Sequence, residues 1–440
     1  MLPVLLWRPI IDAFWPFPDD ADEMERYTHV RARLQLALVC WNFHSIVKSS
    51  NDRLHFVGDA LTEYLDSHIH SPFCLLSTSP ITLELRMQAH HLNRLKPRSF
   101  TECLERMNLH HVIQLRAPVR MLPLSHPLPQ LRCLELVVYD DLSTGFSFES
   151  ELDTLRQLAT RHKSVEKLSL LALLSWESRD NDHYEQLLEA LSHSSALPLK
   201  ELRILDEREH NCISTHVVVA PGALFSRLNH FKQLESLWLG ISRPAVWRND
   251  KVFYEALVHF LRGATALRSL EMPHIEVTGE TSILFQHLVQ HQQSSLTDLW
   301  LGEVDDTIPI RCLPPVLRHL KRLNVNFLTP EGIEEDDGWE PSQLLIDSFN
   351  NVDQLYHYNC WCTPLSLATI TRIIAANHRS TAIYCLHVSL GEADDVDHLV
   401  DTIRLNNTLQ TIGFPHITCE ADTQKINQLQ SSSCRVRLDE

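Results

Sequence analysis

Apolar residues recur along the chain in a six-residue phrase, with large aliphatic side chains at its first, fourth and sixth positions. In a strand the fourth and sixth side chains point to one face and the fifth to the other, so each copy predicts a strand with one buried side. Successive copies begin roughly 30 residues apart, about the length of one supersecondary unit. The copies lie at Leu131–Leu136, Val165–Leu170, Leu199–Ile204, Leu234–Leu239, Leu267–Met272, Leu296–Leu301, Leu320–Val325, Val352–His357, Ile383–Val388 and Leu409–Phe414.

Helical periodicity fills several of the intervals between these copies. In the first interval Leu152, Leu155 and Leu158 form one stripe, as expected of a helix packed on a core. One strand and one helix bury too little apolar area to offset an ordering cost of roughly 1–2 kcal/mol per residue, so the units must stack as a solenoid. Helices are predicted over Glu149–His162, Tyr184–Leu191, Val252–Arg262, Ser282–Gln290, Leu365–Ala376 and Val396–Leu405.

This unit of strand, turn, helix and turn resembles the leucine-rich repeat family over roughly residues 109–440. The resemblance implies an α/β solenoid, a horseshoe whose strands line the concave side and whose helices form the convex side. The turn position that often holds Asn or Cys in the family is matched here only by Cys360. We therefore expect an irregular array.

Residues 2–49 hold two apolar runs separated by the acidic loop Pro16–Glu25. Their spelling resembles the F-box, a short helical motif, at Leu2, Pro3, Leu6, Ile10, Ile11, Leu34, Leu36, Leu38, Val39, Cys40, Phe43 and Val47. The resemblance implies a small all-α domain that docks on the Skp adaptor and cullin of an SCF-type ubiquitin ligase. Its adaptor-binding residues would be Leu2, Pro3, Leu6, Ile10, Leu36, Val39, Cys40 and Phe43. The alternative is a helical cap that only shields the first repeat.

The sequence therefore predicts three parts: an F-box-like domain over 1–50, a connecting segment over 51–108 and the solenoid over 109–440. Within the connecting segment, Leu54–Leu65 and Ser99–Met107 look helical, whereas Ile81–Met87 alternates like a strand. Ile81–Leu85 and Val112–Leu115 are candidates for early repeats. Further along, the acidic, Gly-containing stretch Leu328–Pro341 predicts a projecting loop, and Lys425–Leu438 predicts a closing helix and strand.

Composition restricts the partners. Lys and Arg total 39 against 56 Asp and Glu, which gives a formal charge of −17, so binding to nucleic acid through its phosphates is not expected. The apolar first residues lack a basic leader and a cleavage site, and no apolar run reaches the roughly 18 residues that cross a bilayer. The 11 cysteines have no regular spacing, which favours reduced thiols. We expect a soluble cytoplasmic or nuclear protein that does not bind a membrane.

Catalytic motifs are missing from the sequence. It holds no phosphate-binding Gly-rich loop and no nucleophile elbow, so we expect neither an enzyme nor a cofactor. His287 and His291 have the spacing of a metal pair, but no third ligand is evident. Cys360 and Cys362 flank a single residue, which is not the spacing of a zinc or redox motif. A solvated helix face and a buried structural thiol explain these residues better, and no metal site is predicted.

The fifth position of each phrase faces the concave side and predicts the site of target recognition. In chain order this column is Glu135, Ser169, Arg203, Trp238, Glu271, Trp300, Asn324, Tyr356, His387 and Gly413, with Tyr358 on the same face. Trp and Tyr dominate binding hot spots. The predicted partner-binding residues are Trp238, Glu271, Trp300, Asn324, Tyr356 and Tyr358. The alternative is that the rings pack against each other or under the loop Leu328–Pro341.

Together, the two resemblances imply the substrate-recognition subunit of an SCF-type ubiquitin ligase. Such a subunit binds the Skp adaptor through its F-box and holds a protein target on its repeats. The alternative function is a leucine-rich-repeat interaction scaffold without a role in ubiquitin ligation.

Overall fold

The computed structural model divides into two compact units, and each is described by itself. The first contains Met1–Ser178 and Glu189–Leu199, and the second Arg179–Leu188 and Lys200–Glu440. The structure describes residues 44–45, 47–48, 51–57, 74, 79–86, 107–122, 128–140, 148–174, 183–192, 197–206, 221–240, 251–273, 295–305, 320–328, 354–359, 365–376, 382–385, 388–389, 393–414 and 435–438.

The first unit contains a ladder of parallel strands that begins earlier than the first clear phrase. Its strands are β1 (Arg53–Val57), β2 (Thr82–Arg86), β3 (Gln114–Pro118), β4 (Cys133–Asp140) and β5 (Lys167–Leu174). Buried leucines stay in register across them, in the order Leu54, Leu83, Leu115, Leu134 and Leu168. The early repeats around Ile81 and Val112 are confirmed. The predicted helix Leu54–Leu65 is wrong at its start, because Leu54 to Val57 belong to the strand β1.

Short helical elements connect these strands. The helix α7 (Phe148–Arg161) joins β4 to β5, and the 3₁₀ helices are η2 (Leu109–His111) and η3 (Val119–Met121). The predicted stripe of α7 is confirmed, because Leu152, Leu155 and Leu158 are each at most 1% exposed.

The second unit repeats the same parallel ladder. Its strands are β6 (Glu201–Asp206), β7 (Ser236–Gly240), β8 (Ser269–Met272), β9 (Asp298–Asp305), β10 (Arg322–Leu328), β11 (Gln354–Asn359), β13 (Ala382–Cys385), β15 (Thr411–Phe414) and β16 (Arg435–Leu438). Two short strands, β12 (Leu365–Ser366) and β14 (Val388–Ser389), pair separately. A mixed α/β fold with one parallel strand per repeat is consistent with a leucine-rich-repeat-like solenoid.

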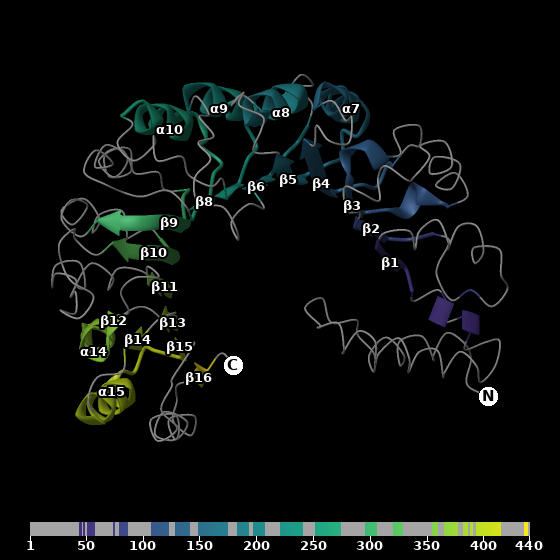
Figure 1. Ribbon diagram of the computed structural model, residues 1–440. Coiled ribbons are helices and arrows are strands. Elements are labelled where there is room, and N and C mark those ends of the chain that lie inside the picture. Colours follow the sequence, from purple (N-terminus) through teal and green to yellow (C-terminus); the bar gives the residue numbers. More distant parts are fainter. Residues whose placement is uncertain are drawn as a thin grey trace. The chain divides into compact units, whose positions relative to one another are not determined.

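Helices of the second unit lie on one side of its strands (Figure 1). They are α9 (Pro221–Leu228), α10 (Lys251–Gly263), α14 (Leu367–Ala376) and α15 (Ala393–Leu405), while α8 (His183–Ser192) is shared between the two units. The predicted helices at α8, α10, α14 and α15 are confirmed within a few residues. The helix α9 was not predicted, and the predicted helix Ser282–Gln290 lies outside the described residues.

The apolar core lies between the helices and the strands. The rings of Phe225 in α9 and Phe260 in α10 have centroids 5.8 Å apart, and both side chains are almost fully buried. On the strand side Leu237 and Leu270 are fully buried. Burying side chains of this size contributes about 1.5–3 kcal/mol each, so the shared core is what holds neighbouring repeats together.

A recurring turn delivers the chain from each helix or loop into the following strand. The first residue of the phrase donates its backbone N–H to the carbonyl three residues earlier, as in Leu131 to Leu128 and Leu234 to Phe231. The accepting residue is buried, because its side chain enters the core: Leu128, Phe231 and Ala264 are at most 8% exposed. At β5 this place is taken by His162, which is only 5% exposed.

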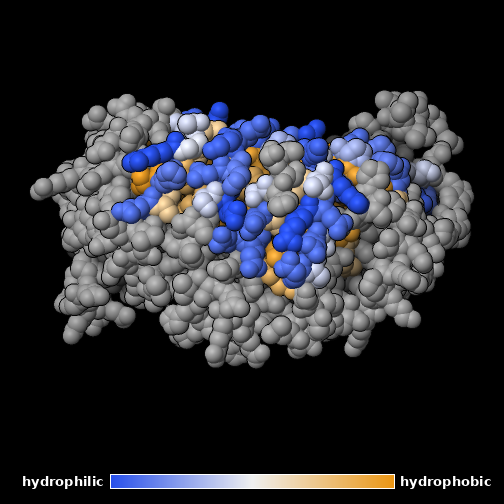
Figure 2. Space-filling model, turned by 90° about the horizontal axis from the view of Figure 1, so that it is seen from above, coloured by the Kyte–Doolittle hydropathy of each residue, from blue (hydrophilic) through white to orange (hydrophobic). Residues whose placement is uncertain are grey.

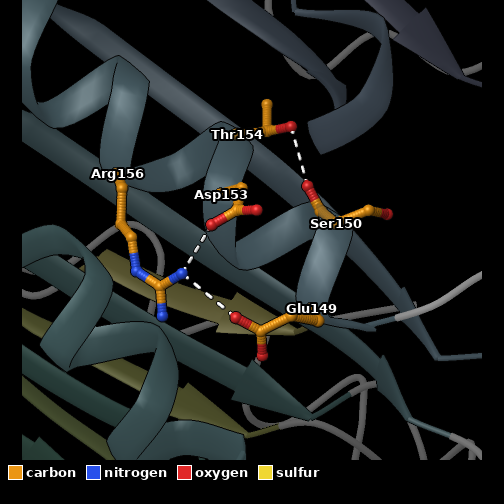
Figure 3. Close-up of polar contacts among 5 residues, drawn as sticks. All are labelled: Glu149, Ser150, Asp153, Thr154 and Arg156. Atoms are coloured by element: carbon orange, nitrogen blue, oxygen red, sulfur yellow. Dashed lines mark hydrogen bonds and ion pairs between the residues drawn. The ribbon is translucent and has the colours of Figure 1, made fainter.

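The outward sides of the helices are hydrophilic. Seen from above, the coloured residues are predominantly polar, with apolar side chains between and beneath them (Figure 2). On α7 the guanidinium of Arg156 lies 3.1 Å from Glu149 and 2.6 Å from Asp153 (Figure 3). Hydrogen bonds to Glu149, and then to Asp153, raise the pKa of Arg156. The helices in the described part of the chain include none that is both long and apolar enough to span a membrane.

Candidate interaction surface

The strand register aligns the predicted column residues of the second unit. Trp238 pairs with Arg203 on one side and Glu271 on the other, and Glu271 pairs in turn with Trp300. These four residues of β6 to β9 are called the tryptophan column below. Burial alternates along β7, where Leu237 and Leu239 are buried and Trp238 is half-buried. The column therefore faces away from the core and the helices, as predicted.

The two indole rings of the column touch. The ring centroids of Trp238 and Trp300 are 5.9 Å apart and the planes are tilted by 34°, which is a favourable separation for an aromatic pair. Because the two strands are separated by β8, the rings meet across the position of Glu271. The alternative that the rings pack against each other is thus correct for this pair, although both residues remain half-buried rather than buried.

Arg203 places a cation at the β6 end of the column. The guanidinium carbon of Arg203 lies 4.9 Å from the centroid of the Trp238 ring, within cation–π range. Its Nε donates a hydrogen bond of 2.8 Å to the carboxylate of Glu201, two residues earlier on the same strand face. Arg203 was placed in the column by the sequence but was not among the predicted partner-binding residues. Its adjacency to Trp238 was the signal that could have identified it.

Glu271 lies between the strands that carry the two tryptophans. Its carboxylate accepts a hydrogen bond of 3.1 Å from the Ser269 hydroxyl, and no cation of the described residues pairs with it. Carboxylates on the same face of β6 and β9 differ, because Glu201 pairs with Arg203 and Asp298 pairs with Arg322. Glu271 is therefore a half-buried carboxylate with a neutral donor and two aromatic neighbours.

The Trp238 side chain lies against Gly240, two residues further along the same strand. A Cβ atom at this glycine would come 3.4 Å from the indole Nε1 of Trp238 and 3.0 Å from Cδ2 of Leu205. That Nε1 is buried and has no acceptor among the described residues. The indole therefore lies along its own strand, next to Gly240, and the rest of its surface faces the other residues of the column.

Other predicted partner-binding residues are placed by the backbone alone. Asn324 pairs with Trp300 and with Tyr356, and Tyr358 pairs with Asn326, so Asn324 and Tyr356 continue the register of the tryptophan column. The side chains of Asn324, Tyr356 and Tyr358 lie outside the described part of the chain. The register shifts by one residue between Asn324 and Asn326, so β9 contains a bulge just beyond Trp300.

The prediction of His387 in the column is wrong. Tyr356 pairs with Tyr384, and Tyr384 pairs with Gly413. Ile383 is the fourth residue of its phrase rather than the first, because it pairs with Leu355 and Ile412. The phrase therefore starts three residues before the predicted one, and Tyr384 takes the register position that the sequence assigned to His387.

The equivalent column of the first unit is charged rather than aromatic. Arg116 lies between Glu84 and Glu135 in the register. Its Nη1 donates to Glu84 over 3.0 Å, and its Nε lies 2.9 Å from Glu135 in an ion pair without hydrogen-bond alignment. All three side chains are about one quarter exposed. Because each charge has a partner, this ladder stabilises the sheet rather than offering an unpaired group.

The F-box-like residues lie outside the described residues, namely Leu2, Pro3, Leu6, Ile10, Leu36, Val39, Cys40 and Phe43. Just after them His44, Ser45, Val47 and Lys48 are helical, and Val47 is buried. Two pairs with possible metal or redox chemistry, His287 with His291 and Cys360 with Cys362, also lie outside the described residues. Within the ranges given above, His, Cys, Asp and Glu form no group of three suited to a metal ion.

Comparison with protein-family models and with curated proteins gives no match. Among solved structures the chain is similar to the leucine-rich repeat-containing protein LegL7 from Legionella pneumophila, with 12% identity and a TM-score of 0.41, over 73% of this chain and 97% of that one. It is also similar to a protein from Bacteroides fragilis, with 14% identity and a TM-score of 0.34, over 58% of this chain, which spans 65% of that protein's length. The repeat architecture rests on the strand register of this chain itself.

Proposed function

We propose that the chain is the substrate-recognition subunit of an SCF-type ubiquitin ligase, acting in the cytoplasm or the nucleus. Its F-box-like segment would bind the Skp adaptor, and its outward strand face would hold a protein target. The observation that carries target binding is the contact of Trp238 with Trp300 on the face away from the helices, at 5.9 Å. Large aromatic side chains that remain half-buried without a partner chain are typical anchors of protein interfaces.

Adaptor binding is supported by the F-box spelling alone. Val39 and Phe43 fall at apolar positions of the second motif helix, and each apolar side chain buried in an interface would contribute about 1.5–3 kcal/mol. No catalytic group is required of this chain, because in such ligases the adaptor and cullin bring the ubiquitin machinery to the target.

The test is co-purification of the tagged full chain from cells, followed by detection of the Skp adaptor and the cullin. The double variant Val39→Asp/Phe43→Asp is expected to lose both, while its thermal unfolding keeps the cooperative transition of the repeats. The matched control Val258→Asp/Phe231→Asp places the same changes in the repeat core, where unfolding rather than selective loss is expected.

Retention of the adaptor by the F-box-like variant would overturn the ligase proposal. Failure of the unmodified chain to capture any adaptor, with capture of another protein that depends on Trp238 and Trp300, would instead support the scaffold function. That alternative is favoured by a specific feature, because the tryptophan column lies within one compact unit and needs nothing from the N-terminal segment.

A further inference from the structure

Glu271 is the outward-facing carboxylate of the tryptophan column whose charge has no counterion in the described residues. Its polar contact among the described residues is the Ser269 hydroxyl at 3.1 Å. A half-buried carboxylate is poorly solvated, and a single neutral donor compensates only part of that loss. On both sides of it stand indole rings, whose faces carry negative potential. Both the charge and the rings therefore attract the same kind of group, which is a cation.

We propose that Glu271, with Trp238 and Trp300, receives a cationic side chain, an arginine or lysine of the target protein. The carboxylate would pair with the guanidinium or ammonium head, and the indoles would contact the cation and its aliphatic stem. This proposal deepens the proposed function, since it rests on the tryptophan column as the target-binding face. The expected partner is a basic segment, which also suits a chain with a net charge of −17.

The chain already contains one copy of the proposed arrangement. The guanidinium of Arg203 lies 4.9 Å from the Trp238 ring centre, and its Nε donates a hydrogen bond of 2.8 Å to the carboxylate of Glu201. Carboxylate, guanidinium and indole thus form a three-part contact at the β6 end of the column. At the other side of Trp238 the carboxylate of Glu271 and the indole of Trp300 are present, and only the cation is missing from the described residues.

Two other ligands fit less well. A nucleic acid could stack bases on the indoles, but its phosphates would be repelled by Glu201, Glu271 and Asp298, which lie on the same face. A purely apolar segment would cover Glu271 and leave its charge without water or a counterion, which is costly. A basic peptide segment satisfies the carboxylate and the rings together.

The test compares two peptide libraries with randomised flanks, one with arginine and one with citrulline at the central position. Citrulline has the shape of arginine without its charge. Each library is captured by the immobilised full chain at equal concentration, and the bound fractions are quantified by mass spectrometry. We expect capture of the arginine library to exceed that of the citrulline library about five- to tenfold. In Glu271→Gln the ratio is expected to fall close to one, whereas in the control Glu235→Gln, which removes an exposed charge near the start of β7, it is expected to persist.

A second variant, Trp300→Leu, keeps the carboxylate and removes one ring, and it is expected to lower the ratio partway. This variant decides the question if Glu271→Gln proves unstable. Equal capture of both libraries by the unmodified chain, a ratio that survives Glu271→Gln, or capture of a uridine oligonucleotide in place of both libraries would each overturn the proposal. Binding of the Skp adaptor does not depend on Glu271, so such a result would leave the ligase proposal standing.

Discussion

The guanidinium carbon of Arg203 lies 4.9 Å from the centroid of the Trp238 ring, although the two residues belong to different repeats. The contact joins β6 to β7 outside the hydrophobic core, on the face where the register pairs the two residues directly. Because Arg203 also binds Glu201 at 2.8 Å, its guanidinium contacts a carboxylate and an indole at once.

Replacing Arg203 with alanine is expected to lower the free energy of unfolding by about 0.5–1 kcal/mol, the usual contribution of an exposed cation–π contact. The measurement is urea unfolding of the full chain at low salt. Arg268→Ala is the matched control, because Arg268 is equally exposed but makes no ring contact among the described residues. Equal losses for the two variants would contradict the role assigned to Arg203.

Gly240→Ala tests the support of Trp238 by its own strand. The added Cβ would meet Leu205 at 3.0 Å and touch the Trp238 indole at 3.4 Å, so the Leu205 side chain must shift while the new methyl group packs against the indole. We expect a loss of about 1 kcal/mol in unfolding free energy, as is common for overpacking, together with a shift in tryptophan emission.

Gly263→Ala is the control for this substitution. There the new Cβ would approach Asn229 Oδ1 at 3.1 Å, the end of a half-buried side chain, and alanine favours the helix by up to about 1 kcal/mol. A neutral or stabilising effect is therefore expected. If Gly240→Ala left the emission unchanged and cost no stability, the indole would not lie where the structure puts it.

The tryptophan column could be predicted from the sequence because each phrase fixes which residue points outward. Leucines at the fourth and sixth positions leave Trp238 only the other face, and the same holds for Trp300. The contact between the two rings could not be predicted, because it depends on side-chain rotamers across an intervening strand. The cation–π contact of Arg203 joins adjacent strands, and the direct pairing of Arg203 with Trp238 is the signal for it in the sequence.

Errors of register arose where the phrase is incomplete. Before β13 the first position of the phrase is Ser380, which carries no apolar side chain, so the apolar pattern alone starts the phrase at Ile383 and puts His387 in the column. At β1 only Leu54 and Phe56 mark the buried face. Leu54 and Val57, together with Leu61 and Leu65, also have the spacing of a helical stripe, and pairing with β2 decides for the strand.

Arg116→Met is expected to destabilise the first unit by about 1–3 kcal/mol, because it removes the cation that lies between the half-buried carboxylates of Glu84 and Glu135. The measurement is again urea unfolding. Adding Glu84→Gln and Glu135→Gln to the same variant is expected to restore part of the loss, since the uncompensated charges are then removed.

The control for this ladder is Arg132→Met. Arg132 pairs with Glu166 at 2.8 Å but is 54% exposed, and exposed pairs contribute about 0.2–1 kcal/mol. Arg132→Met could lower the unfolding free energy as much as Arg116→Met, or the two glutamines could restore none of the loss. Either result would show that partial burial does not strengthen the ion pairs of Arg116.

His162 is expected to make the folded chain less stable in mild acid. It occupies the buried turn position that holds Leu128 and Phe231 in other repeats, and burial, with a smaller contribution from the charge of Arg161, lowers its pKa. In the unfolded chain the histidine keeps a pKa of about 6.5. Below that pH the unfolded state binds more protons than the folded state, so the contribution of His162 to stability is full above it and decreases as the pH falls through this value.

The variant His162→Leu isolates this effect from the other histidines of the chain. Leucine suits the position, because the equivalent residue Leu128 is buried without a polar partner for its side chain. Thermal unfolding between pH 7.5 and 5.5 is expected to show a smaller decrease in midpoint for the variant than for the unmodified chain. His162→Gln, which is polar but does not titrate, is expected to be less stable at every pH and to show the same reduced slope. Parallel pH profiles for all three proteins would exclude His162 as a source of the acid sensitivity.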